Sequence, residues 1–355
     1  MLRRVSNPPN PWAENEVEWL GEPPAAELEV YEEEVERALS ENDSPDVGFR
    51  WSLNPYRGCF SACAYCYARS SHQYWGFGAG TDFDRKIIVK TNAPEKLREE
   101  FHRPSWKGEK IAFSGNTDCY QPLEAVYRVT RRCLEVCRDF RNPVGIITKH
   151  ALVRRDIPLL AEMSRESDVS VTLSIPFADD AIGRAIEPGA SLSSQRFETL
   201  AMLSDAGIRT GIGIAPVIPG LNDSDIGPLL KRARAAGARH AFLVLVRLSG
   251  QTLPVFEERL QEAFPDRASR IWHAIEEMRG GKRNDTRFHD RMVGRGPRWA
   301  AIEALFETQC RRLGLNADHG DADSGERPSS FRRPTAQSEL FPSESRAPRG
   351  IDSPR

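Results

Sequence analysis

The 355-residue sequence has no long hydrophobic run, and its start lacks the apolar stretch of a signal peptide. Purely apolar segments are short, and Ala241 to Val246 is typical, whereas a helix that crosses a bilayer needs about 20 apolar residues. The opening MLRRVSNPPNPW is positively charged, but no apolar segment follows it. We therefore predict a cytoplasmic protein that makes no contact with a membrane.

An excess of charge of one sign is also missing. Lys and Arg number 49 against 51 Asp and Glu, which gives a formal net charge of −2. This balance excludes a strongly basic, histone-like nucleic-acid binder, although it is compatible with a local basic groove. With 39% hydrophobic residues the chain has enough apolar material for a globular core, in one large domain or two ordinary ones.

Cysteine is scarce, and its count of seven is odd. A disulfide framework is not expected in a reducing compartment, so metal ligation or catalysis is the better interpretation. Cys133 and Cys137 are four residues apart in a predicted helix and are expected to pack in the core.

The two ends of the chain differ in composition from the middle. Residues 1–45 are rich in Pro and Glu and are predicted to be a partly disordered extension, with a short helix or an edge extension from Glu27 to Leu39. Residues 316–355 have few apolar residues and are predicted to be a disordered tail, in which SELFP around Leu340 and Phe341 can dock. The core domain is expected to span residues 46–315 and to be closed by helices at its C-terminal end.

Between the ends, short β-rich runs alternate with helical patterns, which predicts an α/β fold. The strands are expected at Lys110–Ser114, Val144–Thr148, Val169–Ile175, Thr210–Val217 and Ala241–Leu248, and the helices at Leu123–Phe140, Asp156–Arg165, Ser194–Ala206 and Asp223–Ala236. Strands that are apolar throughout are typical of a parallel sheet buried on both faces. Strand–helix units of about 30 residues favour a doubly wound sheet or a complete or partial (β/α) barrel.

Polar residues follow directly after all five predicted strands. They are Ser114–Asp118, Lys149–His150, Ser174, Pro216–Gly220 and Arg247–Ser249. In a (β/α) barrel the C-terminal ends of the strands form the rim of the active site, whereas an exposed loop is polar in any fold. This arrangement favours a site at the C-terminal rim.

Three cysteines lie close together with the spacing C-x3-C-x2-C, at Cys59, Cys63 and Cys66. Three thiolates on so short a loop can ligate three irons of a cubane cluster and leave the fourth iron open. A structural zinc site is the alternative, because His72 follows Cys66 by six residues and can supply a fourth ligand.

The cysteine motif, with Tyr65 before its last cysteine and an α/β repeat behind it, resembles the radical S-adenosylmethionine (SAM) superfamily. Further blocks, namely NDSPDVGFRWSLNPYRGCFSACAYCYARSSHQYWG, FSGNTDCYQPLE, ITKHALVRRDIPLL, APVIPGLND and GGKRNDTRFHDRMVGRGP, resemble its spore photoproduct lyase-like or DNA-repair photolyase-like branch. The resemblance covers about Asn42 to Leu315 and implies a partial (β/α)6 barrel.

The resemblance also implies a mechanism. A 4Fe-4S cluster held by Cys59, Cys63 and Cys66 would bind SAM at its open iron. One-electron reduction, from a donor such as flavodoxin or ferredoxin, would cleave SAM to methionine and a 5′-deoxyadenosyl radical that abstracts hydrogen from the substrate. The residues that the resemblance assigns to SAM are Tyr65 beside the adenine, Ser114, Gly115, Asn116 and Thr117 near the amino group, Ser174 near the ribose, Arg184 at the carboxylate, and Ile214, Pro216 and Val217 along the adenine.

One position departs from the pattern of the branch. Spore photoproduct lyase uses a cysteine as hydrogen donor near the strand end that reads SGNTD in this chain, where Gly115 stands. Cys119 lies four residues later. Either Cys119 donates the hydrogen atom, or this protein performs different chemistry, which is the interpretation we favour.

The segment from Arg279 to Trp299 carries seven Lys and Arg against two Asp, with Phe288 interleaved. Such a segment can grip phosphates and stack a base, and it can equally be a solvated loop that closes the open side of the barrel. The sequence therefore predicts a radical SAM enzyme, with a nucleic acid as the leading substrate. A protein or small-molecule substrate is the second reading, and a non-catalytic, metal-stabilised nucleic-acid binder is the third.

Overall fold

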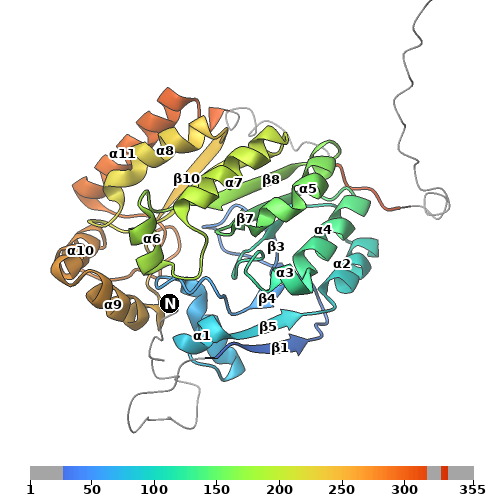
Figure 1. Ribbon diagram of the computed structural model, residues 1–355, viewed down its shortest axis with the longest axis horizontal. Coiled ribbons are helices and arrows are strands. Elements are labelled where there is room, and N and C mark those ends of the chain that lie inside the picture. Colours follow the sequence, from blue (N-terminus) through green and yellow to red (C-terminus); the bar gives the residue numbers. More distant parts are fainter. Residues whose placement is uncertain (1–26, 318–328, 335–355) are drawn as a thin grey trace, which may run out of the picture.

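The computed structural model describes residues 27–317 and 329–334. Its main feature is a seven-stranded sheet in the order β10-β9-β8-β7-β6-β3-β2 (Figure 1). The strands are β2 (Leu39–Glu41), β3 (Trp51–Leu53), β6 (Ile111–Phe113), β7 (Val144–Thr148), β8 (Val169–Ser174), β9 (Arg209–Val217) and β10 (His240–Leu245).

Six of these strands, β3 and β6 to β10, run parallel, and β2 joins the edge antiparallel to β3. In the part of the chain that the structure describes, β2 and β10 are the two edges of this sheet, so it does not close into a full barrel. The expected partial (β/α)6 barrel is thus confirmed. The five predicted strands correspond to β6 to β10. The sixth parallel strand, β3, was not predicted because its segment WSL includes a polar residue, whereas the equally short β6 (IAF) is apolar throughout.

Helices alternate with the strands and cover the outer face of the sheet (Figure 1). They are α2 (Ala93–His102), α3 (Glu124–Tyr127), α4 (Val129–Asp139), α5 (Ile157–Ser164), α6 (Asp180–Ile186), α7 (Ser193–Asp205) and α8 (Ile226–Ala235), with short 3-10 helices η2 (Ala151–Asp156) and η3 (Asp223–Asp225). Gly207 and Gly237 follow α7 and α8 with φ values of +80° and +91°, a left-handed conformation that glycine adopts without strain.

The helix predicted over Leu123–Phe140 is in fact two helices. The chain breaks at Arg128, whose φ is +52°, between α3 and α4. The buried Glu124 carboxylate accepts hydrogen bonds from the backbone N–H groups of Thr130 and Arg131, at 2.9 and 3.2 Å. These bonds satisfy the first donors of α4 and therefore stabilise a new helix start at this point.

The N-terminal segment is a strand, so the alternative of a helix over Glu27–Leu39 is wrong and the edge extension is confirmed. β1 (Glu29–Glu33) pairs in parallel with β5 (Lys86–Lys90), which also pairs with β4 (Tyr56–Arg57) in a second, three-stranded sheet. Pairing with β5 outweighs the helical spacing of the apolar residues. Two strands of this N-terminal segment, β1 and β2, thus pair with strands of the core, and β2 belongs to the main sheet.

The C-terminal end of the described core is helical, as expected. α9 (Thr252–Ala263) and α10 (Pro265–Met278) pack on each other, and α11 (Gly296–Leu313) packs on α8 and α10 (Figure 1). Across residues 27–317 and 329–334, the structure contains no helix with the length and hydropathy of a membrane span.

Part of the expected disordered tail packs on the core. Phe331 is only 9% exposed, and its ring contacts those of Phe101 and Phe140. Arg333 donates to the carbonyl oxygens of Phe101 and Trp106, at 3.1 and 3.0 Å. Disorder was predicted from the polar composition of the tail. The prediction is wrong for Phe331, because its ring packs in an apolar site of the core. Leu340 and Phe341 lie outside the described residues.

Candidate active site

The three cysteines lie on the loop between β4 and the 3-10 helix η1 (Tyr67–Trp75). The loop turns sharply at Gly58 and Ala62, whose φ values are +73° and +53°. A Cβ atom on Gly58 would lie 2.7 Å from the carbonyl oxygen of Lys86, so a larger residue does not fit there.

The segment that follows α6 packs directly against this loop. The backbone N–H of Ala64 donates to the carbonyl oxygen of Ile186, and that of Gly189 donates to Ser61, both at 3.0 Å. A Cβ atom on Gly189 would lie only 1.9 Å from the carbonyl oxygen of Phe60. Glycine at this position therefore permits the two backbones to touch.

Arg69 holds the loop from another side, and its side chain is fully buried. Its Nε donates to the carbonyl oxygen of Cys63 at 3.0 Å, and its Nη1 donates to those of Ala79 and Gly80 at 3.0 Å each. Its Nη2 forms an ion pair with Asp84 at 2.9 Å. The loop is thus pre-shaped by contacts that do not involve the thiols.

The three thiols are free, and those of Cys59 and Cys63 are buried. Burial raises the pKa of all three, that of Cys59 to about 12. The thiols are therefore protonated in the free loop, and iron has to replace these protons when it binds.

Among residues 27–317 and 329–334, no group of three His, Cys, Asp or Glu side chains converges in a way that would hold a single metal ion. A structural zinc site would need a fourth ligand beside the three thiols, whereas a cubane cluster can be held by three thiolates. The zinc alternative took His72 as the fourth ligand, but its ring packs against those of Phe77 and Phe83. Three thiol donors on one pre-shaped loop thus fit a 4Fe-4S cluster better than zinc.

A buried carboxylate, Glu187, lies beside the cysteine loop and joins three polar side chains. It forms an ion pair with Arg196 at 2.5 Å and another with Lys149 at 3.1 Å, and it accepts a hydrogen bond from the phenol of Tyr65. Although burial acts to raise it, the charges of Arg196 and Lys149 hold the pKa of Glu187 below its usual value. Two cations against one anion leave this corner positively charged.

Lys149 connects this corner to the strand ends. Its Nζ donates to the hydroxyl of Ser174 at 2.6 Å and to the carbonyl oxygen of Ala215 at 3.4 Å, and it lies 5.6 Å from the centre of the Tyr65 ring. Tyr65 and Ser174, two of the residues predicted to contact SAM, are thus brought together by a lysine that the prediction did not include.

The strand end at Ser114–Thr117 also lies next to the cysteine loop. Ser114 has a φ of +72°, and the backbone N–H of Asn116 donates to the side chain of Asn54 at 2.7 Å. The phenol of Tyr67, the residue after Cys66, donates to the carbonyl oxygen of Gly115. Thr117 is buried, with its hydroxyl bonded to a backbone carbonyl of β4 at 2.6 Å.

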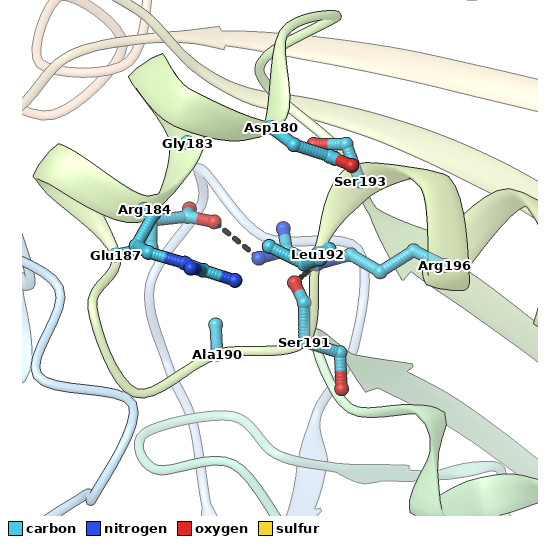
Figure 2. A pocket seen from close by; sticks show the side chains of 9 residues that line it. All are labelled: Asp180, Gly183, Arg184, Glu187, Ala190, Ser191, Leu192, Ser193 and Arg196. Carbon is cyan, nitrogen blue, oxygen red and sulfur yellow. Dashed lines mark hydrogen bonds and ion pairs between the residues drawn. The ribbon is translucent and has the colours of Figure 1, made fainter.

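The remaining predicted SAM contacts are placed less directly. The side chains of Ile214 and Val217 are fully buried in the core, and the carbonyl of Ala215 between them is the group that reaches Lys149. Arg184 is exposed on α6 and lines a small pocket with Glu187 and Arg196, as Figure 2 shows.

Cys119 does not lie at the rim. Its side chain is fully buried, and burial raises the pKa of its thiol well above the usual value. Its carbonyl oxygen accepts from Thr130 and its N–H donates to Ser114, so it is built into the strand-end turn. A hydrogen donor has to be reached by the substrate radical, and this placement argues against Cys119 in that role.

Several residues of the basic segment are committed to the fold. Arg279 is 5% exposed and donates to four backbone carbonyls, and Trp299 is 2% exposed. Arg287 and Arg295 form ion pairs with Asp290. Only part of the charge that the sequence displays is therefore available to a ligand, while Phe288 remains 53% exposed.

A pre-shaped loop of three thiols at the rim of a six-stranded partial barrel defines the class of protein. The sequence model of the radical SAM superfamily matches residues 53–233, about half of the chain, and the chain belongs to that superfamily. Members of the superfamily cleave SAM with an iron–sulfur cluster.

Individual relatives cover most of this core. An uncharacterized protein of Mycobacterium bovis is 38% identical over 224 residues, which are 62% of this chain and 66% of that protein. An uncharacterized protein of Methanocaldococcus jannaschii is 30% identical over 56% of this chain and 71% of its own length. A radical SAM Nalpha-GlyT isomerase of Pseudomonas phage M6 is 28% identical over 64% of this chain and 46% of its own. The chain thus spans just under two thirds of its mycobacterial relative.

Solved structures give the same fold. Spore photoproduct lyase complexed with dinucleoside spore photoproduct aligns with a TM-score of 0.60 at 15% identity, over 84% of this chain and 86% of that one. A variant of the same lyase with bound AdoMet aligns with a TM-score of 0.58 over 81% and 80%. The expected likeness to this branch is confirmed at the level of fold.

Three residues of the site, Arg69, Glu187 and Arg196, were not predicted from the sequence. Lys149 was predicted only as a polar residue at the C-terminal rim, with no role of its own. Arg69, Glu187 and Arg196 carried none, because each lies in a helical or loop segment where a charged residue is ordinary.

Proposed function

We propose that this chain is an enzyme that generates a 5′-deoxyadenosyl radical and uses it to abstract hydrogen from a nucleic-acid substrate. The observation that carries the proposal is the loop of three free thiols beside the corner formed by Glu187, Lys149 and Arg196. When bound, a 4Fe-4S cluster and SAM supply the one-electron cleavage chemistry. Flavodoxin or ferredoxin is the proposed source of the electron.

The residues of the chain position and shield this chemistry. Cys59, Cys63 and Cys66 would hold the cluster, and the positive corner at Lys149 and Arg196 attracts a carboxylate such as that of SAM. Glu187 fixes Lys149, Arg196 and the Tyr65 phenol relative to one another through its two oxygens. The buried contacts of Gly189 and Arg69 keep the loop from opening to water.

A nucleic acid is the proposed substrate on two grounds. A solved neighbour with the same fold is a lyase complexed with a dinucleoside photoproduct, and one relative is a phage protein named as a radical SAM isomerase. The rim also exposes aromatic rings, with Tyr67 at 47% and Phe288 at 53%, which can stack on bases. The same proposal includes a lyase reaction that repairs DNA.

Anaerobic reconstitution tests the enzyme. We expect about four irons per chain and production of 5′-deoxyadenosine from SAM under a strong reductant. Cys63→Ala is expected to lose the cluster and SAM cleavage, whereas Cys310→Ala, which changes a buried cysteine of α11, is expected to keep both. Full cleavage by Cys63→Ala would refute the proposal.

The substrate is tested with ultraviolet-irradiated DNA carrying deuterium at candidate carbons. Transfer of deuterium into 5′-deoxyadenosine identifies the site of abstraction. SAM cleavage without transfer from DNA or RNA of any kind would exclude a nucleic-acid substrate while leaving the radical chemistry intact.

A further inference from the structure

Arg247, a cation at the rim, forms no ion pair within the described part of the chain. It follows β10 at the C-terminal edge of the sheet, and its buried Nε atom has no hydrogen-bond acceptor among the described residues. Within residues 27–317 and 329–334 no carboxylate forms an ion pair with it, and its guanidinium lies 5.6 Å from the centre of the Tyr67 ring. A buried donor without an acceptor is unfavourable, which makes this residue a candidate for ligand binding.

The nearby cation Arg291 is fully used by the fold. It pairs with Asp46 and donates to the hydroxyl of Ser44, while Asp46 also accepts from the backbone N–H of His289 at 2.6 Å. The carboxylate of Asp46, which acts electrostatically on Arg247, is therefore already paired with Arg291. Burial and the positive charge of Arg291 lower the pKa of Arg247, yet an arginine remains charged at neutral pH.

The backbone around Arg247 is held rigidly. The N–H of Val246 donates to Val217 at 2.9 Å, and its carbonyl oxygen accepts from the buried Arg279 at 2.8 Å. The N–H of Leu248 donates to the side chain of Asn284 at 3.0 Å. The side chain of Arg247 is thus presented from a fixed support, as a preformed binding site requires.

Tyr67 ties this position to the reaction site. Its ring contacts Arg247, its phenol is bonded to Gly115, and its backbone follows Cys66 directly. A ligand atom on Arg247 would therefore lie one side chain away from the strand end at Gly115. This separation suits a group of the substrate next to the reacting carbon.

We infer that Arg247, backed by the Tyr67 ring, is a subsite for an oxyanion of the substrate, either a phosphodiester or a carboxylate. The inference rests on the proposed function, because it takes this rim as the substrate site. Guanidinium donors in a planar fork match two oxygens of such a group. The unpaired charge is then compensated only when substrate is bound.

The test compares wild-type protein with Arg247→Gln and with Arg312→Gln, which removes the same charge from the exposed end of α11. Pyrophosphate and malonate serve as the phosphate and carboxylate probes, with binding measured by calorimetry on the reconstituted holoprotein. A thymidine dinucleotide and its uncharged methylphosphonate analogue form the nucleic-acid arm.

We expect Arg247→Gln to weaken one oxyanion probe at least tenfold, with SAM affinity, iron content and thermal stability unchanged, and Arg312→Gln to change nothing. The probe that wild-type protein binds more tightly shows whether the oxyanion is a phosphate or a carboxylate. If the dinucleotide also weakens tenfold and its methylphosphonate analogue does not, the oxyanion is a backbone phosphate.

Three results would overturn the inference. The subsite does not exist if Arg247→Gln binds both probes as tightly as wild type does. It also does not exist if wild-type protein binds neither probe. Loss of SAM affinity in Arg247→Gln would place the residue in the cofactor site instead. Probe binding that depends on Arg247 without dinucleotide binding would keep the subsite and refute the nucleic-acid substrate.

Discussion

Single buried residues control the surroundings of the cysteine loop. Arg69 satisfies three backbone carbonyls and pairs with Asp84, so its charge is fully engaged although no water reaches it. A buried ion pair is costly to break, because the remaining partner is left uncompensated. His72, six residues after the last cysteine of the loop, is also buried, but as an uncharged ring that packs against aromatic neighbours.

His72 makes stability depend on pH. Burial lowers its pKa to about 4, against an unfolded value of about 6.5. As the pH falls below 6.5 the unfolded chain binds a proton that the folded chain refuses, so the contribution of His72 to stability falls by about 3 kcal/mol between pH 6.5 and 4. Asp84, whose pKa burial raises to about 6, acts in the opposite direction over this range, so the effect of His72 is read from its variant. Urea unfolding of the apoprotein across this range measures the effect.

Matched variants assign the effect to this residue. His72→Phe is expected to flatten the decline, although not completely, because burial also lowers the pKa of His150. His273→Phe changes an exposed histidine of α10 and is expected to keep the wild-type profile. An identical slope in His72→Phe and wild type would contradict the assignment.

At the scale of elements, the site depends on the turn after α6 meeting the cysteine loop. The contact uses backbone on both sides, through the bonds from Ala64 to Ile186 and from Gly189 to Ser61. This backbone contact leaves no room for a Cβ atom at Gly189, so only glycine fits at that position.

Gly189→Ala is expected to push the loop away from α6, since its Cβ atom would lie 1.9 Å from the carbonyl oxygen of Phe60. The result is a lower iron content after reconstitution and a loss of stability of about 2 kcal/mol. Gly227→Ala is the control, because a Cβ there meets nothing within 4 Å. Gly227 lies in α8, and its replacement by Ala should raise the free energy of unfolding by about 0.5–1 kcal/mol. Equal iron content in the two variants would show that the contact does not shape the loop.

At the scale of the whole molecule, two loops far apart in sequence link the open edges of the sheet. The loop that contains Asp46 joins β2 to β3, and the loop that contains Arg291 is bonded to β10 through the N–H of Leu245 and the carbonyl oxygen of Met292 at 3.0 Å. The ion pair between Asp46 and Arg291 therefore spans the gap of the partial barrel. Its partners are nearly buried, with side chains 4% and 12% exposed.

Asp46→Asn is expected to release this connection. Because Arg291 is left without a countercharge, residues 42–50 and 285–293 should exchange backbone hydrogens about 100-fold faster. Hydrogen exchange followed by mass spectrometry measures this locally. Asp43→Asn, an exposed change on the same loop, should have no effect. Unchanged exchange in Asp46→Asn would show that the edges are held by other contacts.

The sequence by itself determined the strands β6 to β10 and the three cysteines of the loop. Both follow from local information, because apolar runs and short ligand spacing are read along the chain. β3 (WSL) is short and includes a polar residue, so it carries too little of this information, whereas the equally short β6 (IAF) is apolar throughout. β1 was ambiguous because three of its five residues are glutamates, which are common on exposed helices. The partial barrel was implied only by the resemblance to the radical SAM superfamily.

Only the tertiary structure decided which polar residues surround the loop. Glu187, Arg196 and Lys149 come from three segments, and their charges matter because burial brings them together. The same holds for the basic segment, where folding buries Arg279, and for Cys119, which the core encloses. Within the described residues no carboxylate forms an ion pair with Arg247, and the lack of such a partner is a property of three-dimensional neighbours that no spacing along the chain encodes.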